Sequence, residues 1–158
     1  MGRSCVGNDL LLPGDNVIPC RDADLINRFA NDPSIRPFIG GKGPLDLTAI
    51  TQGANVALFG EYGGFCLSWC APDTYEIHTL ILPEGRGQWA FDWAAQSIAY
   101  MESLGAIQMW TRVHPDHRHT AIFTRKMGLK PCGDIMTDYG DGPVAYKMFN
   151  WRKPCQQQ

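Results

Sequence analysis

The amino-acid sequence lacks the features that would place it at once in several large classes of protein. It has no apolar run of about 18 residues, so we predict no membrane-spanning helix and no membrane partner. Its 14 Lys and Arg nearly balance its 16 Asp and Glu, which leaves no basic field, so no nucleic-acid partner is predicted. The N-terminal apolar stretch is too short for a secretory signal, which favours a cytoplasmic location.

Disulfide and metal patterns are missing as well. The six cysteines form no C-x-x-C pair, and we expect reduced thiols that act as small buried hydrophobes. Three of the four histidines crowd into residues 114–119 (HPDHRH), but their spacing matches no zinc-binding pattern. We therefore predict no metal site, and we interpret this segment as a solvated loop followed by a first helical turn.

The 158 residues present are enough for one domain with a sizeable core, and 44% of them are hydrophobic. The 17 glycines and 11 prolines indicate many turns between short elements. Residues 1–55 are irregular, residues 56–149 carry regular hydrophobic patterns, and residues 150–158 are expected to form a polar tail. We interpret residues 1–158 as a single domain with these three parts.

The regular patterns predict an α/β (α+β) fold. They indicate a meander of three antiparallel strands, a long helix, a further strand, a second helix and a terminal hairpin. A strand–helix–strand crossover places its two strands parallel, so the central sheet should be mixed, with helices on both faces. In chain order the predicted elements are residues 56–60, 65–70, 75–82, 88–105, 107–113, 115–127, 129–137 and 143–149.

Local signals add detail to this outline. Asp22 is expected to cap a helix over residues 22–32, and Asp116 is expected to cap the second helix of the core. Residues 16–20 are predicted to form a short strand, and a short helix is expected to start near Leu45. Leu104 is placed on the buried face of the long helix.

The segment LILPEGRGQWA, residues 80–90, carries the strongest functional signal. A strand ends there, a glycine-bearing turn follows, and the long helix begins. The first turn of a helix offers unpaired backbone N–H groups and a partial positive charge, and together these bind anions such as phosphates. The pattern is neither a P-loop nor a dinucleotide-binding fingerprint. A plain structural turn is the alternative interpretation.

The order P-x-x-R-G-x-x-A in this turn resembles the acetyl-CoA-binding motif of the GNAT superfamily of N-acetyltransferases. The segment AIFTRKMGLK, residues 121–130, is similar to a later helix of that family, and the order of elements agrees. The resemblance covers about residues 56–149. Residues 32–41, 75–87 and 112–129 also resemble segments of GNAT-like proteins encoded by tailed phages, which would place the chain in the host cytoplasm.

The resemblance implies acetyl-CoA as co-substrate and an unidentified amine as acceptor. The predicted strand over residues 75–82 corresponds to the fourth strand of the family. Backbone groups at its end would pair with the pantetheine arm, and amides of the following turn would hold the pyrophosphate. The amine would attack the thioester directly, with Glu76 or His78 as general base. The cofactor-binding residues it implies are Leu80, Ile81, Leu82, Gly85, Arg86, Gly87, Gln88, Trp89 and Ala90.

The sequence departs from the family pattern in the turn and in the later helix. Trp89 and Phe91 stand where the family has small residues, Thr124 stands in place of a tyrosine used as general acid, and Arg118 in place of an asparagine. These departures leave open a second hypothesis, a catalytically inactive GNAT-fold protein that acts as a phage structural or assembly component. Acceptor loops are expected within residues 33–48, and a homo-oligomer or a virion partner also stays open.

Overall fold

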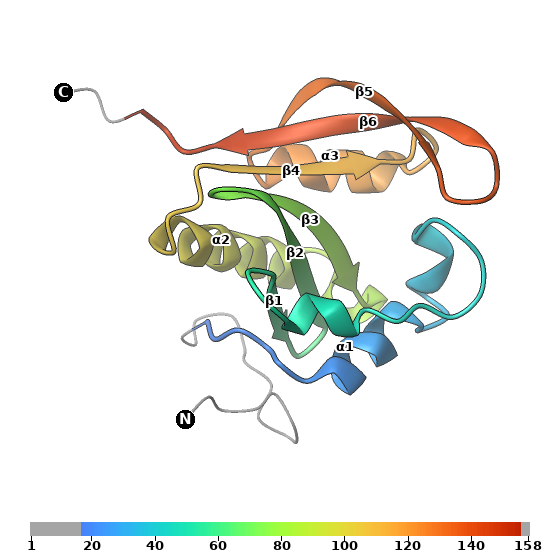
Figure 1. Cartoon of the computed structure of the whole chain (residues 1–158), viewed down its shortest axis with the longest axis horizontal. Helices are drawn as coiled ribbons and strands as arrows, with labels where there is room; N and C mark the ends of the chain where they lie inside the picture. The colour runs from blue at the N-terminus through green and yellow to red at the C-terminus, as the bar shows by residue number, and fades with distance from the viewer. Residues whose placement is uncertain (1–16, 156–158) are drawn as a thin grey trace.

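The computed structural model describes residues 17–155, whose six strands form one sheet (Figure 1). The helices are α1 (Ala23–Ala30), α2 (Gln88–Ser103) and α3 (Arg118–Lys126), with short 3-10 helices η1 (Arg36–Phe38), η2 (Thr48–Thr51) and η3 (Pro83–Gly85). The strands are β1 (Val56–Gly60), β2 (Gly63–Ala71), β3 (Thr74–Ile81), β4 (Gln108–Val113), β5 (Lys130–Asp138) and β6 (Pro143–Arg152). None of the described helices is both long and apolar enough to cross a membrane.

The sheet has the strand order β1-β2-β3-β4-β6-β5, and only the central β3–β4 pair is parallel. Two antiparallel halves, β1-β2-β3 and β4-β6-β5, therefore meet at one parallel junction. Helix α2 makes the crossover between them, as a parallel connection requires. The predicted mixed α/β sheet, with its meander and its crossover, is confirmed.

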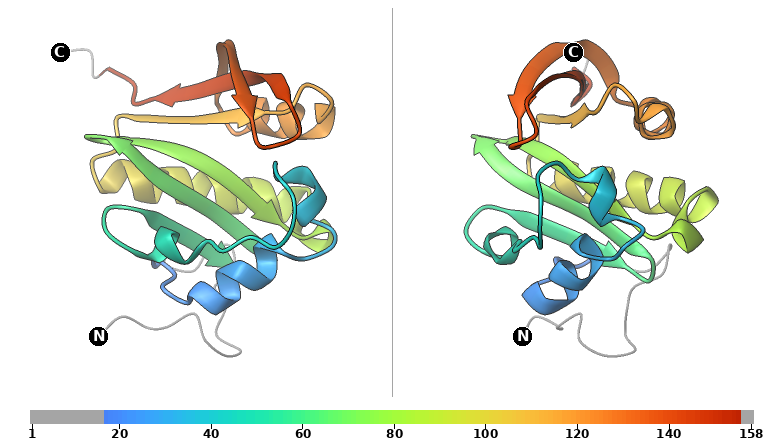
Figure 2. Two further views of the ribbon diagram at one scale, coloured as in Figure 1. Left: turned by 45° about the vertical axis from the view of Figure 1, so that its right-hand side comes forward. Right: turned by 90° about the vertical axis from the view of Figure 1, so that its right-hand side faces the viewer.

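Both faces of the sheet are covered because consecutive strand residues point to opposite sides. In β1, Val56 and Leu58 pack toward α2 and α3, whereas Ala57 and Phe59 pack toward α1 and η2. Trp93 of α2 is fully buried in the core between the sheet and α2, which we call the first core. Its indole Nε1 donates a hydrogen bond of 3.1 Å to the Leu58 carbonyl oxygen. Figure 2 shows α1 and α2 on opposite sides of the sheet.

Helix α1 begins where the sequence predicts. The Asp22 carboxylate accepts a hydrogen bond of 3.0 Å from the Leu25 backbone N–H, which satisfies one of the free donors of the first turn. Nearby, the short helix expected close to Leu45 is the 3-10 helix η2, Thr48–Thr51. Asn31 and Asn27 tie the intervening segment to α1, since their side-chain oxygens accept the Leu45 and Leu47 N–H groups.

Five local predictions are wrong. Cys20 and Cys66 are buried as expected, but Cys70, Cys132 and Cys155 are exposed. Residues 17–20 form no strand, although the Cys20 N–H donates a hydrogen bond of 2.7 Å to the Ala57 carbonyl oxygen, and residue 16 lies outside the described part. Leu104 is 50% exposed, because α2 ends at Ser103 and the chain turns away from the core. His117 rather than Asp116 is the N-cap of α3. Strand β6 runs on to Arg152, so the expected tail begins later than residue 150.

Candidate functional site

The two halves of the sheet separate soon after they meet. Pairing between β3 and β4 covers only residues 74–76 and 108–110, although β3 continues to Ile81 and β4 to Val113. The Thr111 hydroxyl donates a hydrogen bond of 2.8 Å to the Ile77 carbonyl oxygen, which fixes the branch point. Beyond it, the facing edges of both strands are not paired with each other, and buried backbone groups require partners. We call this opening the β3–β4 slot.

The open end of the slot leads to the turn before α2. Gly87, the N-cap, has φ 108° and ψ −137°, and no side chain caps the helix. The first N–H groups of α2 therefore have no side-chain cap, and free N–H groups at a helix N-terminus are the groups that bind anions. Gly85 is required for close packing, because a Cβ at this position would lie 2.4 Å from Tyr62 Cβ.

The motif residues of this turn divide between the protein interior and its surface. Arg86 is exposed, but its guanidinium reaches away from the helix: Nη2 donates to the Ser34 carbonyl oxygen at 3.2 Å, and Cζ lies 5.8 Å from the Phe38 ring centroid. Gln88 is exposed and donates from Nε2 to Asp92 Oδ1 at 2.8 Å. Gly87 is exposed as well, whereas Ala90 lies on the buried face of α2.

Trp89, the largest departure from the family pattern, lies to one side of the anion site. Its ring stacks on Trp93 with centroids 5.7 Å apart and meets the edge of Tyr62 at 5.3 Å. The side chain is partly buried and packed against the first core. Phe91 points to α3 instead, with its ring 5.1 Å from Phe123. The bulk of Trp89 is thus accommodated by packing.

At the end of β3, Leu80 is buried toward α1 and Ile81 toward α2, so both side chains belong to the two cores. Leu82 lies just beyond the strand, and its N–H donates to the Tyr62 carbonyl oxygen at 2.8 Å. A ligand in the slot would therefore meet only the backbone of Leu80 and Ile81.

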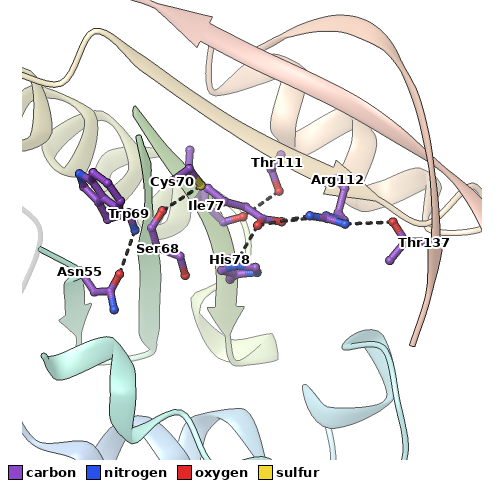
Figure 3. A network of polar contacts seen from close by, with 10 residues as sticks. Asn55, Ser68, Trp69, Cys70, Ile77, His78, Thr111, Arg112 and Thr137 are labelled. Atoms are coloured by element: carbon purple, nitrogen blue, oxygen red, sulfur yellow. Dashed lines mark hydrogen bonds and ion pairs between the residues drawn. The ribbon is translucent and has the colours of Figure 1, made fainter. Parts of the chain in front are cut away.

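The two candidate bases differ in their surroundings (Figure 3). Glu76 is largely buried and paired with Arg112, whose Nε and Nη2 lie 2.8 and 3.4 Å from the carboxylate oxygens. Arg112 Nη1 also donates to Thr137 Oγ1 at 2.9 Å. Because its carboxylate is engaged by a guanidinium, Glu76 is poorly suited to accept a proton from a substrate.

His78 is the better candidate base. Its side chain is 44% exposed, and its Nε2 lies 3.8 Å from Glu76 Oε2. Burial lowers the pKa of His78 below its ordinary value, with Glu76 opposing this shift and Arg112 adding to it. A neutral imidazole beside a fixed carboxylate can accept a proton, and the carboxylate then stabilises the imidazolium that forms.

Sequence reasoning missed the part played by Arg112 and Thr111. Both lie in an alternating strand, where nothing marks which side chain faces a splayed partner. The histidine segment is a loop followed by the first turn of α3, as predicted, but it is less solvated than expected. His114 and His117 are half-buried, with tilted rings whose centroids lie 4.9 Å apart, whereas His119 is exposed. Within residues 17–155, no three His, Cys, Asp or Glu side chains lie close enough together to hold a metal ion.

Comparison with known proteins identifies the fold. No family model and no curated protein matches the chain. Among solved structures, a probable GNAT-family acetyltransferase from Chromobacterium violaceum superposes with a TM-score of 0.69 and 14% identity, covering 92% of this chain and 87% of that one. A GNAT-family acetyltransferase from Bacillus anthracis gives 0.67 and 12%, covering 90% and 97%.

A third similar structure carries a ligand. This putative acetyltransferase from Salmonella typhimurium, solved with its cofactor acetyl-CoA, gives a TM-score of 0.61 and 10% identity, covering 85% of this chain and 87% of that one. The chain described here therefore has the GNAT fold. At these identities the likeness defines the architecture, and activity has to be argued from the site itself.

Proposed function

We propose that this protein is an acetyl-CoA-dependent N-acetyltransferase that moves an acetyl group to an amine by direct attack. The observation that carries the proposal is the β3–β4 slot, which opens toward the N-terminus of α2. No side chain caps this helix end, so its backbone N–H groups are available to a ligand. An extended arm bearing amides can pair with the open strand edges, while its pyrophosphate binds the helix N-terminus. Acetyl-CoA has both parts, and the similar Salmonella structure was solved with it.

The side chains around the slot supply the remaining chemistry. His78 would take a proton from the attacking ammonium, directly or through one water, because it is the uncharged base at this point of β3. Glu76, held by Arg112, would orient the imidazole and stabilise its charged form. The amine nitrogen would then bond to the thioester carbonyl carbon, the carbon–sulfur bond would break, and the departing thiolate would take the second proton lost by the nitrogen.

Calorimetry with acetyl-CoA tests the proposal, with two single-charge variants as a matched pair. Gln88→Glu puts a carboxylate at the first position of α2, where the helix dipole favours it but a bound pyrophosphate would be repelled. Ala95→Glu adds the same charge at an exposed position in the middle of the helix. We expect micromolar binding to the wild type, at least about tenfold weaker binding to Gln88→Glu and unchanged binding to Ala95→Glu. No binding at millimolar acetyl-CoA would refute the proposal.

The second hypothesis is a GNAT-fold protein without catalysis that acts in phage assembly, and one observation favours its first part, the lack of catalysis. Thr124 is buried in the packing of α3, so it does not replace the missing tyrosine as a proton donor at the surface of the slot. Release of the CoA thiol in the presence of a panel of amines separates the two. Acetyl-CoA binding without amine-dependent thiol release would support the second hypothesis.

A further inference from the structure

Five aromatic rings from four separate segments form a continuous series beside the slot. We call them the aromatic arc: Phe38, His117, His114, Tyr146 and Tyr139. Neighbouring ring centroids along the series lie 5.2, 4.9, 5.4 and 5.6 Å apart. Two of the contacts, those of Tyr146 with its neighbours, are nearly perpendicular, so the edge of one ring meets the face of the other. The two end rings offer free surface, since Phe38 is 55% and Tyr139 43% exposed.

The two ends of the arc are joined by the loop after η1. Gly40 lies against Tyr139 so closely that a Cβ on Gly40 would be 2.2 Å from Tyr139 Cδ2. Lys42 Nζ forms an ion pair of 3.1 Å with Asp141 Oδ1 in the same hairpin. Figures 1 and 2 show this loop approaching the tip of the β5–β6 hairpin. These two contacts hold the loop after η1 against the β5–β6 hairpin, so the first and last rings of the arc, Phe38 and Tyr139, lie on segments that are in contact.

The arc lies next to the proposed site. His114 directly follows the last residue of β4, and His117 is the N-cap of α3. On the other side, Phe38 contacts the guanidinium of Arg86 from the turn before α2. Tyr139 is close enough to Arg112 for the two to interact electrostatically. The five rings thus border the slot on the face that carries His78 and Glu76.

Within residues 17–155, the carboxylates around the arc are already engaged or point into water. Glu76 is bound by Arg112, and Asp141 by Lys42. Asp138 accepts hydrogen bonds from two backbone N–H groups of its own hairpin. Asp116 lies 3.9 Å from His114 Nδ1, but its side chain is 88% exposed. An ammonium ion entering the arc would meet ring faces, not a buried, unpaired carboxylate.

We propose that the aromatic arc binds the acceptor and selects an amine with a single positive charge and an aromatic or compact apolar body. The negative faces of aromatic rings attract an ammonium ion, and the rings also pack against an apolar body. A polyamine would bring further charges for which the arc offers no buried partner. This inference rests on the proposed function, since it names the class of acceptor for that reaction.

The charge state of the arc fits this assignment. Burial and the neighbouring His114 lower the pKa of His117, while Asp116 opposes the shift. His117 is therefore neutral at pH 7, and its ring can face a cation without repelling it. The permanent positive charges near the arc are Arg86, beside Phe38, and Arg112, near Tyr139 and Tyr146, and Arg112 is neutralised by its ion pair with Glu76. Acidification that protonates His117 should weaken acceptor binding.

The test uses phenethylamine as the aromatic monoamine and spermidine as the polyamine. Each is titrated by calorimetry into the full-length protein, with and without saturating CoA, and each is assayed as acceptor by thiol release from acetyl-CoA. Tyr146→Leu removes one ring of the arc, and Tyr146→Phe keeps the ring without its hydroxyl. Phe38→Ala probes a second ring that is 55% exposed, which makes misfolding a poor explanation of any loss. Trp69→Leu removes an exposed aromatic ring outside the arc as the control.

We expect phenethylamine to be preferred over spermidine by at least about tenfold in affinity and in kcat/KM. Tyr146→Leu and Phe38→Ala should weaken phenethylamine about tenfold, whereas Tyr146→Phe and Trp69→Leu should change it less than about threefold. No phenethylamine binding, a preference for spermidine, or equal binding by Tyr146→Leu and the wild type would overturn the inference. Failure of acetyl-CoA itself to bind would instead overturn the proposed function, and the amine titrations without CoA would still test the arc.

Discussion

The branch point of the sheet makes the sharpest prediction for stability. Thr111→Val keeps the shape of the side chain but removes the hydroxyl that donates to the Ile77 carbonyl oxygen at 2.8 Å. Ile77 is only 4% exposed, so its carbonyl would lose a partner that water does not readily replace. Loss of a hydrogen bond with a buried acceptor left behind costs about 1–2 kcal/mol, which in a chain of this length lowers Tm by roughly 3–6 °C.

Urea unfolding followed by tryptophan fluorescence measures this difference directly. Thr111→Ser is the matched variant, because it keeps the hydroxyl and removes only the methyl group. We expect Thr111→Val to fall below Thr111→Ser in unfolding free energy, and to bind acetyl-CoA more weakly as the slot loses its fixed end. If Thr111→Val were as stable as the wild type, or if Thr111→Ser lost as much, the hydroxyl would not hold the branch point and our account of the slot would be refuted.

Three further predictions concern the site and its supports. The pKa of His78 is lowered, so its imidazole becomes charged only below about pH 6.5, and kcat/KM should fall as the pH drops through that range. A pH profile measured between about pH 5 and 8 should lose this fall in His78→Gln. Gly85→Ala should cost about 1–3 kcal/mol in urea unfolding, because its Cβ would clash with Tyr62 Cβ, and an unchanged midpoint would contradict the packing described. Asp22→Ala should cost about 1 kcal/mol by loss of the α1 cap while Asp22→Asn costs less, and equal losses would argue against a capping role.

Most of the sheet and all three helices could be predicted because their signals are local, although the start of α3 was placed too early. Alternation in β1 to β3 and the Asp22 cap depend on residues close together in the sequence. Asp116 misled for the same reason: it looks like a cap, but the His114 ring accepts its backbone N–H, and the helix starts later.

The site was predictable only in part. The turn before α2 and His78 lie within one short segment, and its pattern can be read along the chain. The aromatic arc gathers rings that are up to 108 positions apart in the sequence, from Phe38 to Tyr146, and no local pattern relates them. The orientation of Trp89 likewise depends on Tyr62 across a turn and on Trp93 one helical turn away.

The short parallel junction also has a consequence for how the chain folds. Each antiparallel half of the sheet contains a hairpin between neighbouring strands, so pairing there closes short loops. The three residue pairs between β3 and β4 close a loop that includes all of α2, and closing longer loops costs more entropy. The pairs between β4 and β6, from Val113–Lys147 to Gln108–Arg152, join residues at least as far apart as those between β3 and β4. We expect the hairpins to gain protection first in pulsed hydrogen exchange, and β4 to gain it last. In that order of events the slot is completed when β4 enters the sheet between hairpins that have already formed.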